Sequence, residues 1–144
     1  MNDYSVRAQV YEMTMQSGLP PKADEVARAM STTRTTVAAA FERLAAAHVL
    51  VLQPATNEIL MANPFSAVPT PFRVKAGGVS AYGNCIWDAL GIPAMLKRDA
   101  QILTSCADCG TAAEIAVEAN VVKGHGVLHF VVPAREWWND IVFT

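Results

Sequence analysis

The residues of this sequence best suited to chemistry are a cysteine and an aspartate, Cys85 and Asp88. They lie three positions apart at the expected start of a helix, so their side chains share one face of it. A thiol in the first helical turn is close to unsatisfied N–H groups and the positive end of the helix dipole, which lower its pKa. Asp88, beside Trp87 and apolar neighbours, is expected to be desolvated enough to hold or relay a proton near neutral pH. The spacing predicts a nucleophile beside an acid. By itself, the spacing is at least as compatible with a buried cysteine and an aspartate that acts as a local cap.

The other two cysteines, Cys106 and Cys109, form a Cys-x-x-Cys pair followed by glycine. The pair is half of a common zinc site, but structural zinc takes four ligands and no second pair is present. A complete site would have to use Cys85, His125 or His129. A redox pair is less favoured because the pair does not begin a helix after a strand, and capture or transfer of a thiophilic metal is a further option. The pattern alone favours a tight turn with one or both thiols buried, and three cysteines do not predict a disulfide framework.

The second half of the chain must position these residues, and its patterns predict an α+β fold with a mostly antiparallel sheet. A helix is expected over 84–95, ended or kinked by Pro93, and Pro133 is well placed to start a terminal helix through Trp137 and Trp138. His129 lies in an apolar run and is expected to be a core residue. Strands are expected over 72–75, 100–105, 114–117 and 127–132. They are short and adjacent in sequence, which favours meander pairing.

The first half predicts a small helical unit that ends in a hairpin. Helices are expected over 4–16, 23–30 and 34–47, and strands over 49–52 and 59–61. This order is typical of a winged helix-turn-helix module. Three prolines within eight residues, Pro64, Pro69 and Pro71, then predict an extended linker that contains neither helix nor central strand. We therefore expect a winged-helix-like lobe over 1–63 and a catalytic lobe over 64–144.

Composition and charge restrict the classes of function. The chain has 144 residues, of which 52% are hydrophobic and 17% charged, and its formal net charge is −2, so it is expected to fold around a core. No signal-peptide pattern or long apolar run is evident, and we expect a cytoplasmic protein with no membrane partner. Residues 1–63 contain five basic and six acidic side chains, with Arg34 and Arg43 as the only cations of the third helix. This balance argues against nucleic acid as a partner and favours a packing platform for the second half.

Three segments in order resemble one known family. They are the run from Asn84 to Ala94, the run from Ser105 to Gly110, and the stretch that begins at His129 and ends with Trp137-Trp138-Asn139-Asp140-Ile141. Together these segments are similar to the alkylmercury lyase (organomercurial lyase) family. The likeness covers nearly the whole chain, because that family places a winged-helix-like lobe ahead of its catalytic lobe.

The resemblance implies protonolysis of a carbon–mercury bond, which gives a hydrocarbon and Hg(II). In that family the cysteine matching Cys85 takes the mercury, and the aspartate matching Asp88 handles the proton delivered to the departing carbon. Soft thiolates select soft metals, and an acid within reach can protonate the carbon in a water-poor pocket. Aromatic side chains are expected to line an apolar cleft, namely Trp87, Phe72, Phe130 and Trp137.

The resemblance also implies cofactors and partners. No organic cofactor is expected, Hg(II) would remain as a product ligand, and a structural zinc is the less favoured possibility. The substrate would be a small organomercurial, and a mercuric reductase or small thiols would receive the Hg(II).

One departure from the family bears on the metal ligands. The family's second catalytic cysteine lies just downstream of the segment that residues 137–144 resemble, and no position of this sequence matches it. Cys106 or Cys109 would replace it if the fold brought one of them next to Cys85. Two other functions stay open: a winged-helix regulator that senses a thiophilic metal through the three cysteines, and a catalytically inactive family member that sequesters metal.

Overall fold

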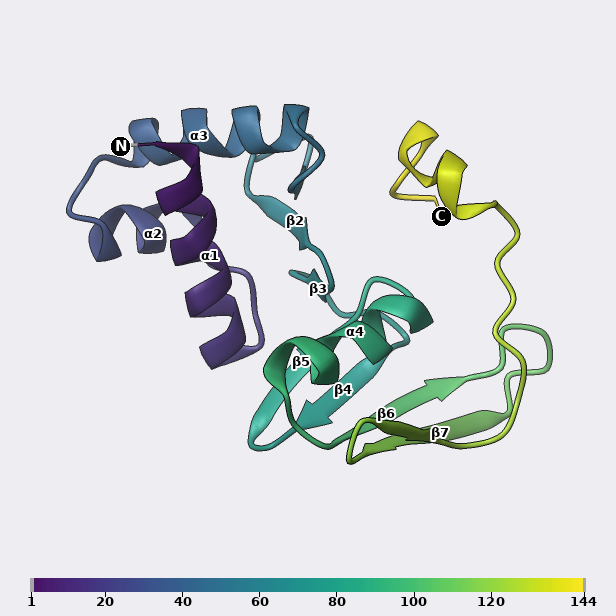
Figure 1. The fold of residues 1–144 in the computed structure, drawn as a ribbon. Helices are drawn as coiled ribbons and strands as arrows, with labels where there is room; N and C mark the ends of the chain where they lie inside the picture. The colour runs from purple at the N-terminus through teal and green to yellow at the C-terminus, as the bar shows by residue number, and fades with distance from the viewer. Residues whose placement is uncertain (1, 144) are drawn as a thin grey trace.

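The first half of the chain folds into three helices followed by a small antiparallel sheet (Figure 1). The computed structural model describes residues 2–143. The helices are α1 (Asp3–Ser17), α2 (Ala23–Ala29) and α3 (Arg34–Ala46), and the strands are β1 (Val51–Leu52), β2 (Ile59–Ala62) and β3 (Phe65–Ser66), in the order β1-β2-β3.

Helix α3 shows why these residues fold as predicted. Thr33 caps its first turn by accepting a hydrogen bond from the backbone N–H of Thr36. Val37, Phe41 and Leu44, expected from their spacing to face inward, are buried. They belong to one hydrophobic cluster with buried residues of α1, α2, β2 and the segment before β1.

The expected linker after β2 has no helix and no central strand, but it contains one short edge strand. Asn63 and Pro64 form a turn, and the next two residues form β3, which pairs with β2 in the register Met61 opposite Ser66. Pro64 lacks an amide N–H, but the residues after it can still pair, so the prolines do not exclude a strand here. The fully buried side chain of Phe65 packs in a second hydrophobic cluster, which also contains Val74, Ile92 and Ile102 of the second half. Strand β3 therefore connects the first sheet to the core of the second half.

The second half is a five-stranded antiparallel sheet with one helix, α4 (Ile86–Leu96), packed on it, so the α+β prediction is confirmed. Val74 lies opposite Ala81 on one side and Ile102 on the other, and all three are buried. The neighbouring Arg73 and Lys75 are exposed, as expected when one face of a sheet is solvated. The strands are β4 (Arg73–Ala76), β5 (Val79–Tyr82), β6 (Ala100–Ser105), β7 (Ala112–Glu118) and β8 (Val121–Lys123), in the order β5-β4-β6-β7-β8.

The two halves meet where α1 approaches β5. Gly18 ends α1 in the left-handed conformation, with φ of 81°. A Cβ at this position would collide with the carbonyl group of Ser80 in β5, so both the backbone angle and the close approach require glycine.

Two expectations for residues 127–132 are corrected. Residues 127–132 are not a strand: Val127 and Val131 are 91% and 81% exposed, and His129 is exposed rather than in the core. Gly124 and Gly126, with φ of 153° and 136°, interrupt the extended backbone after β8. The terminal helix after Pro133 is the 3-10 helix η1 (Ala134–Asn139). Pro93 lies inside α4, which continues to Leu96.

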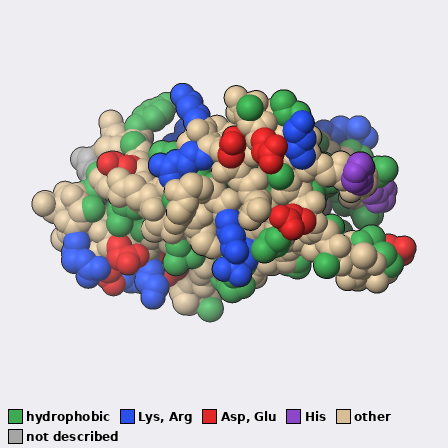
Figure 2. All heavy atoms as spheres, turned by 90° about the horizontal axis from the view of Figure 1, so that it is seen from below, with side chains coloured by type: hydrophobic (Ala, Val, Ile, Leu, Met, Phe, Trp, Pro, Cys, Tyr) green, Lys and Arg blue, Asp and Glu red, His purple; other side chains and the backbone are tan. Residues whose placement is uncertain are grey.

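The surface carries mixed charge. In the view from below, basic and acidic side chains are interspersed and form no basic stripe on that face (Figure 2). Among the described residues, no helix has the length and apolar character needed to cross a membrane.

Candidate active site

Cys85 and Asp88 lie at the start of α4. Cys85 is the N-cap residue, with an extended backbone (φ −144°, ψ −177°), and its carbonyl accepts the first helical hydrogen bond, from the N–H of Ala89 at 2.9 Å. Asp88 is the third residue of the helix. The predicted placement of the pair at a helix start is therefore correct, with the cysteine one position before the first turn.

Gly83 allows α4 to begin where it does. A Cβ at Gly83 would lie 2.5 Å from the backbone N of Ala89, so a larger residue would push the start of the helix away. The backbone of Gly83 is also fixed on both sides, because its N–H donates to the carbonyl of Phe72 at 2.9 Å and its carbonyl accepts from the Thr70 hydroxyl at 2.6 Å. The end of β5 and the loop from Thr70 thus hold the chain that leads to Cys85.

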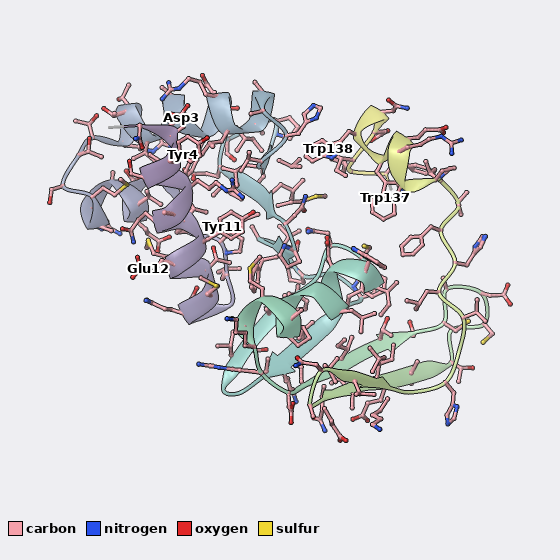
Figure 3. The ribbon with its side chains drawn as sticks, in the orientation of Figure 1. Asp3, Tyr4, Tyr11, Glu12, Trp137 and Trp138 are labelled. Atoms are coloured by element: carbon pink, nitrogen blue, oxygen red, sulfur yellow. The ribbon has the colours of Figure 1, made fainter. Side chains whose placement is uncertain are left out.

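Asn84 orients the carboxylate of Asp88. Its Nδ2 donates to Asp88 Oδ2 at 2.9 Å and to Asn63 Oδ1 at 3.1 Å. The carbonyl of Asn63 accepts a hydrogen bond from the Tyr11 hydroxyl at 2.9 Å. Tyr11 lies on the side of α1 that faces β2 and β3 (Figure 3). A chain of hydrogen bonds therefore links the first helix to the candidate acid.

Burial shifts the pKa of both candidate residues. It raises the pKa of the Asp88 carboxyl above its ordinary value, and the hydrogen bonds from Asn84 oppose this only in part. Desolvation was the sequence-based expectation for Asp88, and it is confirmed. Burial also raises the pKa of the Cys85 thiol, against the opposing effect of the backbone N–H groups of Asp88 and Trp87. The expectation of a lowered thiol pKa is wrong. Desolvation of the half-buried sulfur raises the pKa by more than the backbone N–H groups at the helix start lower it.

Cys106 and Cys109 lie in the turn between β6 and β7, and both are exposed. The expected tight turn is present, but the expected burial of the thiols is not. Cys109 Sγ donates to Thr111 Oγ1 at 3.2 Å. Hydrogen bonding to Thr111, with a further contribution from the Cys106 side chain, lowers the pKa of Cys109 to about 7. The hydroxyl can rotate to donate once the thiol has ionised, which explains the direction of the shift.

The three cysteines do not form one metal cluster. No group of three or more cysteine, histidine or acidic side chains within residues 2–143 is arranged to hold a metal ion. Figure 1 shows the β6–β7 turn projecting from the end of its hairpin, apart from the start of α4. His125 and His129, considered above as zinc ligands, complete no such group either.

The aromatic residues expected to line a cleft have different environments. Phe72 packs against the second hydrophobic cluster, and Trp87 is 60% exposed beside Cys85. Phe130 and Trp137 contact each other, with ring centroids 5.3 Å apart. Of these four aromatic residues, Trp87 is the one next to the candidate pair in sequence. Its ring presents an apolar surface to solvent.

The C-terminal segment returns to the first half of the molecule. The Trp138 ring stacks on that of His48 at the end of α3, with centroids 4.3 Å apart and planes 5° from parallel. Figure 3 shows Trp138 on the side of η1 nearest α3. Trp137 donates its indole N–H to the carbonyl of Val132 at 2.8 Å. These contacts place residues 134–139 beside α3 rather than on the five-stranded sheet.

Sequence reasoning missed Asn63 and Tyr11, and it gave Asn84 no role. Asn84 immediately precedes Cys85, and that position was the only available signal. Asn63 and Tyr11 lie 21 and 73 positions before Asn84, and no spacing pattern connects them, because their contacts depend on how the two halves pack.

Comparison with known proteins decides the family. A model of the alkylmercury lyase family matches residues 65–144. This chain belongs to the alkylmercury lyase family. Among solved structures, this chain is similar to the crystal structure of the mercury-bound form of MerB2, with a TM-score of 0.63 and 20% sequence identity. The alignment covers 82% of this chain and 58% of that one, and at this identity the likeness establishes the fold. A comparison with curated proteins gave no match.

Proposed function

We propose that this chain cleaves carbon–mercury bonds by protonolysis, with Cys85 as the mercury ligand and Asp88 as the proton relay. One observation carries the proposal: a thiol at the N-cap of α4 and a carboxyl group with a raised pKa at its third residue lie at the start of one helix. Membership of the alkylmercury lyase family supports the same chemistry.

The raised pKa of Cys85 is compatible with this role. A thiol that coordinates a soft metal ion is deprotonated by the metal itself, so the sulfur does not need to be ionised beforehand. The S–H bond of Cys85 breaks as the S–Hg bond forms. The Asp88 carboxylate takes up the released proton, and burial of Asp88 favours this protonated form.

The second step returns the proton to carbon. The electron pair of the C–Hg bond moves to carbon, the proton on Asp88 forms the new C–H bond, and the hydrocarbon leaves. Mercury stays on the Cys85 sulfur as Hg(II), so its oxidation state does not change. A small thiol from solution would supply the second sulfur ligand of the Hg(II).

Asn84 would act as a positioning residue in this scheme. Its donated hydrogen bond at 2.9 Å fixes one carboxylate oxygen of Asp88. Because Asn84 also bonds Asn63, which the Tyr11 hydroxyl holds, the orientation of Asp88 depends on the packing of the two halves.

Activity is tested by measuring hydrocarbon in the headspace above protein, excess small thiol and a simple organomercurial. We expect wild-type protein to release hydrocarbon. The Asp88→Asn variant should bind mercury and release hydrocarbon roughly 10²–10⁴ times more slowly, which is the usual contribution of a positioned acid. Asp24→Asn is the matched control, because Asp24 is an exposed carboxylate on α2. Mercury binding without hydrocarbon from wild-type protein would support the sequestering alternative instead.

The regulator alternative is less well supported by the charges on α3. Arg34 bonds Glu58 at 2.9 Å and Arg43 bonds Asp3 at 2.7 Å, so both cations of this helix are paired with carboxylates. DNA readers instead present such cations to phosphates. A gel shift with promoter DNA at low salt separates the two functions, and a salt-dependent shift would favour the regulator.

A further inference from the structure

The turn between β6 and β7 carries two thiols in a loop closed by backbone hydrogen bonds. The N–H of Gly110 donates to the carbonyl of Cys106 at 2.9 Å, and the N–H of Cys106 donates to the carbonyl of Thr111 at the same distance. Gly110 has a φ of 71°, a conformation that glycine adopts without strain. The backbone therefore holds Cys106 and Cys109 within one closed turn.

The two side chains interact and neither serves the core. Both cysteines are exposed, and Cys109 bonds the Thr111 hydroxyl at 3.2 Å and interacts with the Cys106 side chain. A structural role would bury the thiols as small apolar groups, as free cysteines usually are. Exposure leaves both sulfur atoms open to a ligand from solution.

We propose that Cys106 and Cys109 form a two-coordinate site for a soft, thiophilic metal cation such as Hg(II), separate from Cys85. Two thiols lose two protons as two S–Hg bonds form, and mercury stays as Hg(II). Soft thiolates select soft cations. Zinc would require two further ligands, and no group of three or more suitable side chains exists within residues 2–143.

The donor pair also predicts how strongly the site binds. Once one sulfur holds the metal, the second is already in the same turn, so closing the second bond is intramolecular. Such linkage typically raises affinity by roughly 10²–10⁴-fold over one donor. A single thiol in this turn should therefore bind Hg(II) far more weakly than the pair.

The test uses the full chain with Cys85→Ser, reduced and freed of reductant, so that only the proposed pair remains. Inorganic Hg(II) is added against a competing small monothiol. We expect one Hg(II) per chain, loss of both reactive thiols, and a native mass equal to the chain plus mercury minus two hydrogens. Adding Cys109→Ser should weaken binding by roughly 100-fold or more. Adding Ser105→Ala, a change in the neighbouring residue, should leave binding unchanged.

Several results would overturn the site. One is that the protein binds no Hg(II) in competition with the monothiol. Others are that mercury protects only one thiol per chain, that it bridges two chains, or that Cys109→Ser leaves the affinity unchanged. Displacement of Hg(II) by zinc at equal concentration would also overturn it. If Cys85→Ser does not fold, as judged by circular dichroism, the double variant Cys106→Ser with Cys109→Ser is compared with wild type, and it should lose one bound Hg(II). None of these measurements depends on cleavage, so failure of the lyase proposal would leave this test interpretable.

Discussion

The molecule holds cysteine in two contrasting environments. Cys85 is half-buried at the start of α4, next to a carboxyl group, and burial raises its pKa. Cys109 is exposed in a hairpin turn, next to a hydroxyl and a second thiol, and its pKa is lowered to about 7. Burial near a carboxyl group suits the proposed cleavage, whereas exposure beside a second sulfur suits the proposed capture of metal. The surroundings of a thiol therefore decide its chemistry more than its place in a motif does.

The first prediction concerns Cys85, and it separates the roles of the two cysteine environments. Cys85→Ser should lower hydrocarbon release by at least about 10³-fold, because this substitution removes the proposed mercury ligand and leaves only binding contributions. The variant should retain its secondary structure by circular dichroism and its capture of Hg(II) at the exposed pair. Full cleavage activity in this variant would end the assignment of Cys85.

The second prediction concerns the backbone that positions Cys85. Gly83→Ala should lower the free energy of unfolding by about 1–3 kcal/mol, because the new methyl group meets the backbone of Ala89. Chemical denaturation measures this. Gly91→Ala, in the same helix, is the control: its Cβ would lie 3.4 Å from Pro64 Cβ, and it should be stabilising by about 0.5–1 kcal/mol. Equal effects of the two substitutions would contradict the close approach at Gly83.

The third prediction tests the positioning of Asp88. Asn84→Ala removes a hydrogen bond to a carboxylate and should reduce cleavage about 10- to 100-fold. Because that hydrogen bond lowers the pKa of Asp88, its loss should also raise this pKa. The single-turnover rate of carbon protonation, which needs protonated Asp88, should then fall at a higher pH than in wild type. Gln101→Ala, on the solvent face of β6, should change neither quantity. A slower enzyme with an unshifted pH profile would indicate a merely structural role for Asn84.

The smallest effect is on stability. Because the pKa of Asp88 is raised in the folded state, ionisation of Asp88 destabilises the native state at a pH above that pKa. Below the ordinary pKa of 3.8, Asp88 is protonated in both the folded and the unfolded state, and the destabilisation is absent. Asp88→Asn should therefore raise Tm slightly at about pH 8, and the difference should vanish at about pH 3. Thermal scans at both values measure it, and a wild type that is the more stable at the higher pH would refute the direction.

Local patterns predicted most of the elements that carry the site. The spacing of Val37, Phe41 and Leu44 marked the buried face of α3, and the apolar run after Asn84 marked α4. These patterns succeed because the periodicity of a helix is a property of neighbouring residues. The boundary between lobes at 63 and 64 stays a prediction.

Long-range features could not be predicted in this way. The apolar run 127–132 has the composition of a strand, but a strand also needs a partner edge, and β8 pairs with β7 over only three positions. The pKa of Cys85 depends on how deeply folding buries the sulfur, and its helix position alone suggested the opposite sign. The hydrogen bonds that join Tyr11 to Asp88 arise from packing between the halves.

Cleavage carried out in deuterium oxide tests whether Asp88 delivers an exchangeable proton to carbon. Protein and organomercurial are mixed in a single turnover with excess thiol, and the hydrocarbon is analysed by mass spectrometry. We expect one deuterium in each hydrocarbon molecule from wild-type protein, because an exchangeable proton passes through Asp88 to carbon, and we expect strongly reduced product from Asp88→Asn. Hydrocarbon without deuterium, or equal yields from the two proteins, would contradict this expectation.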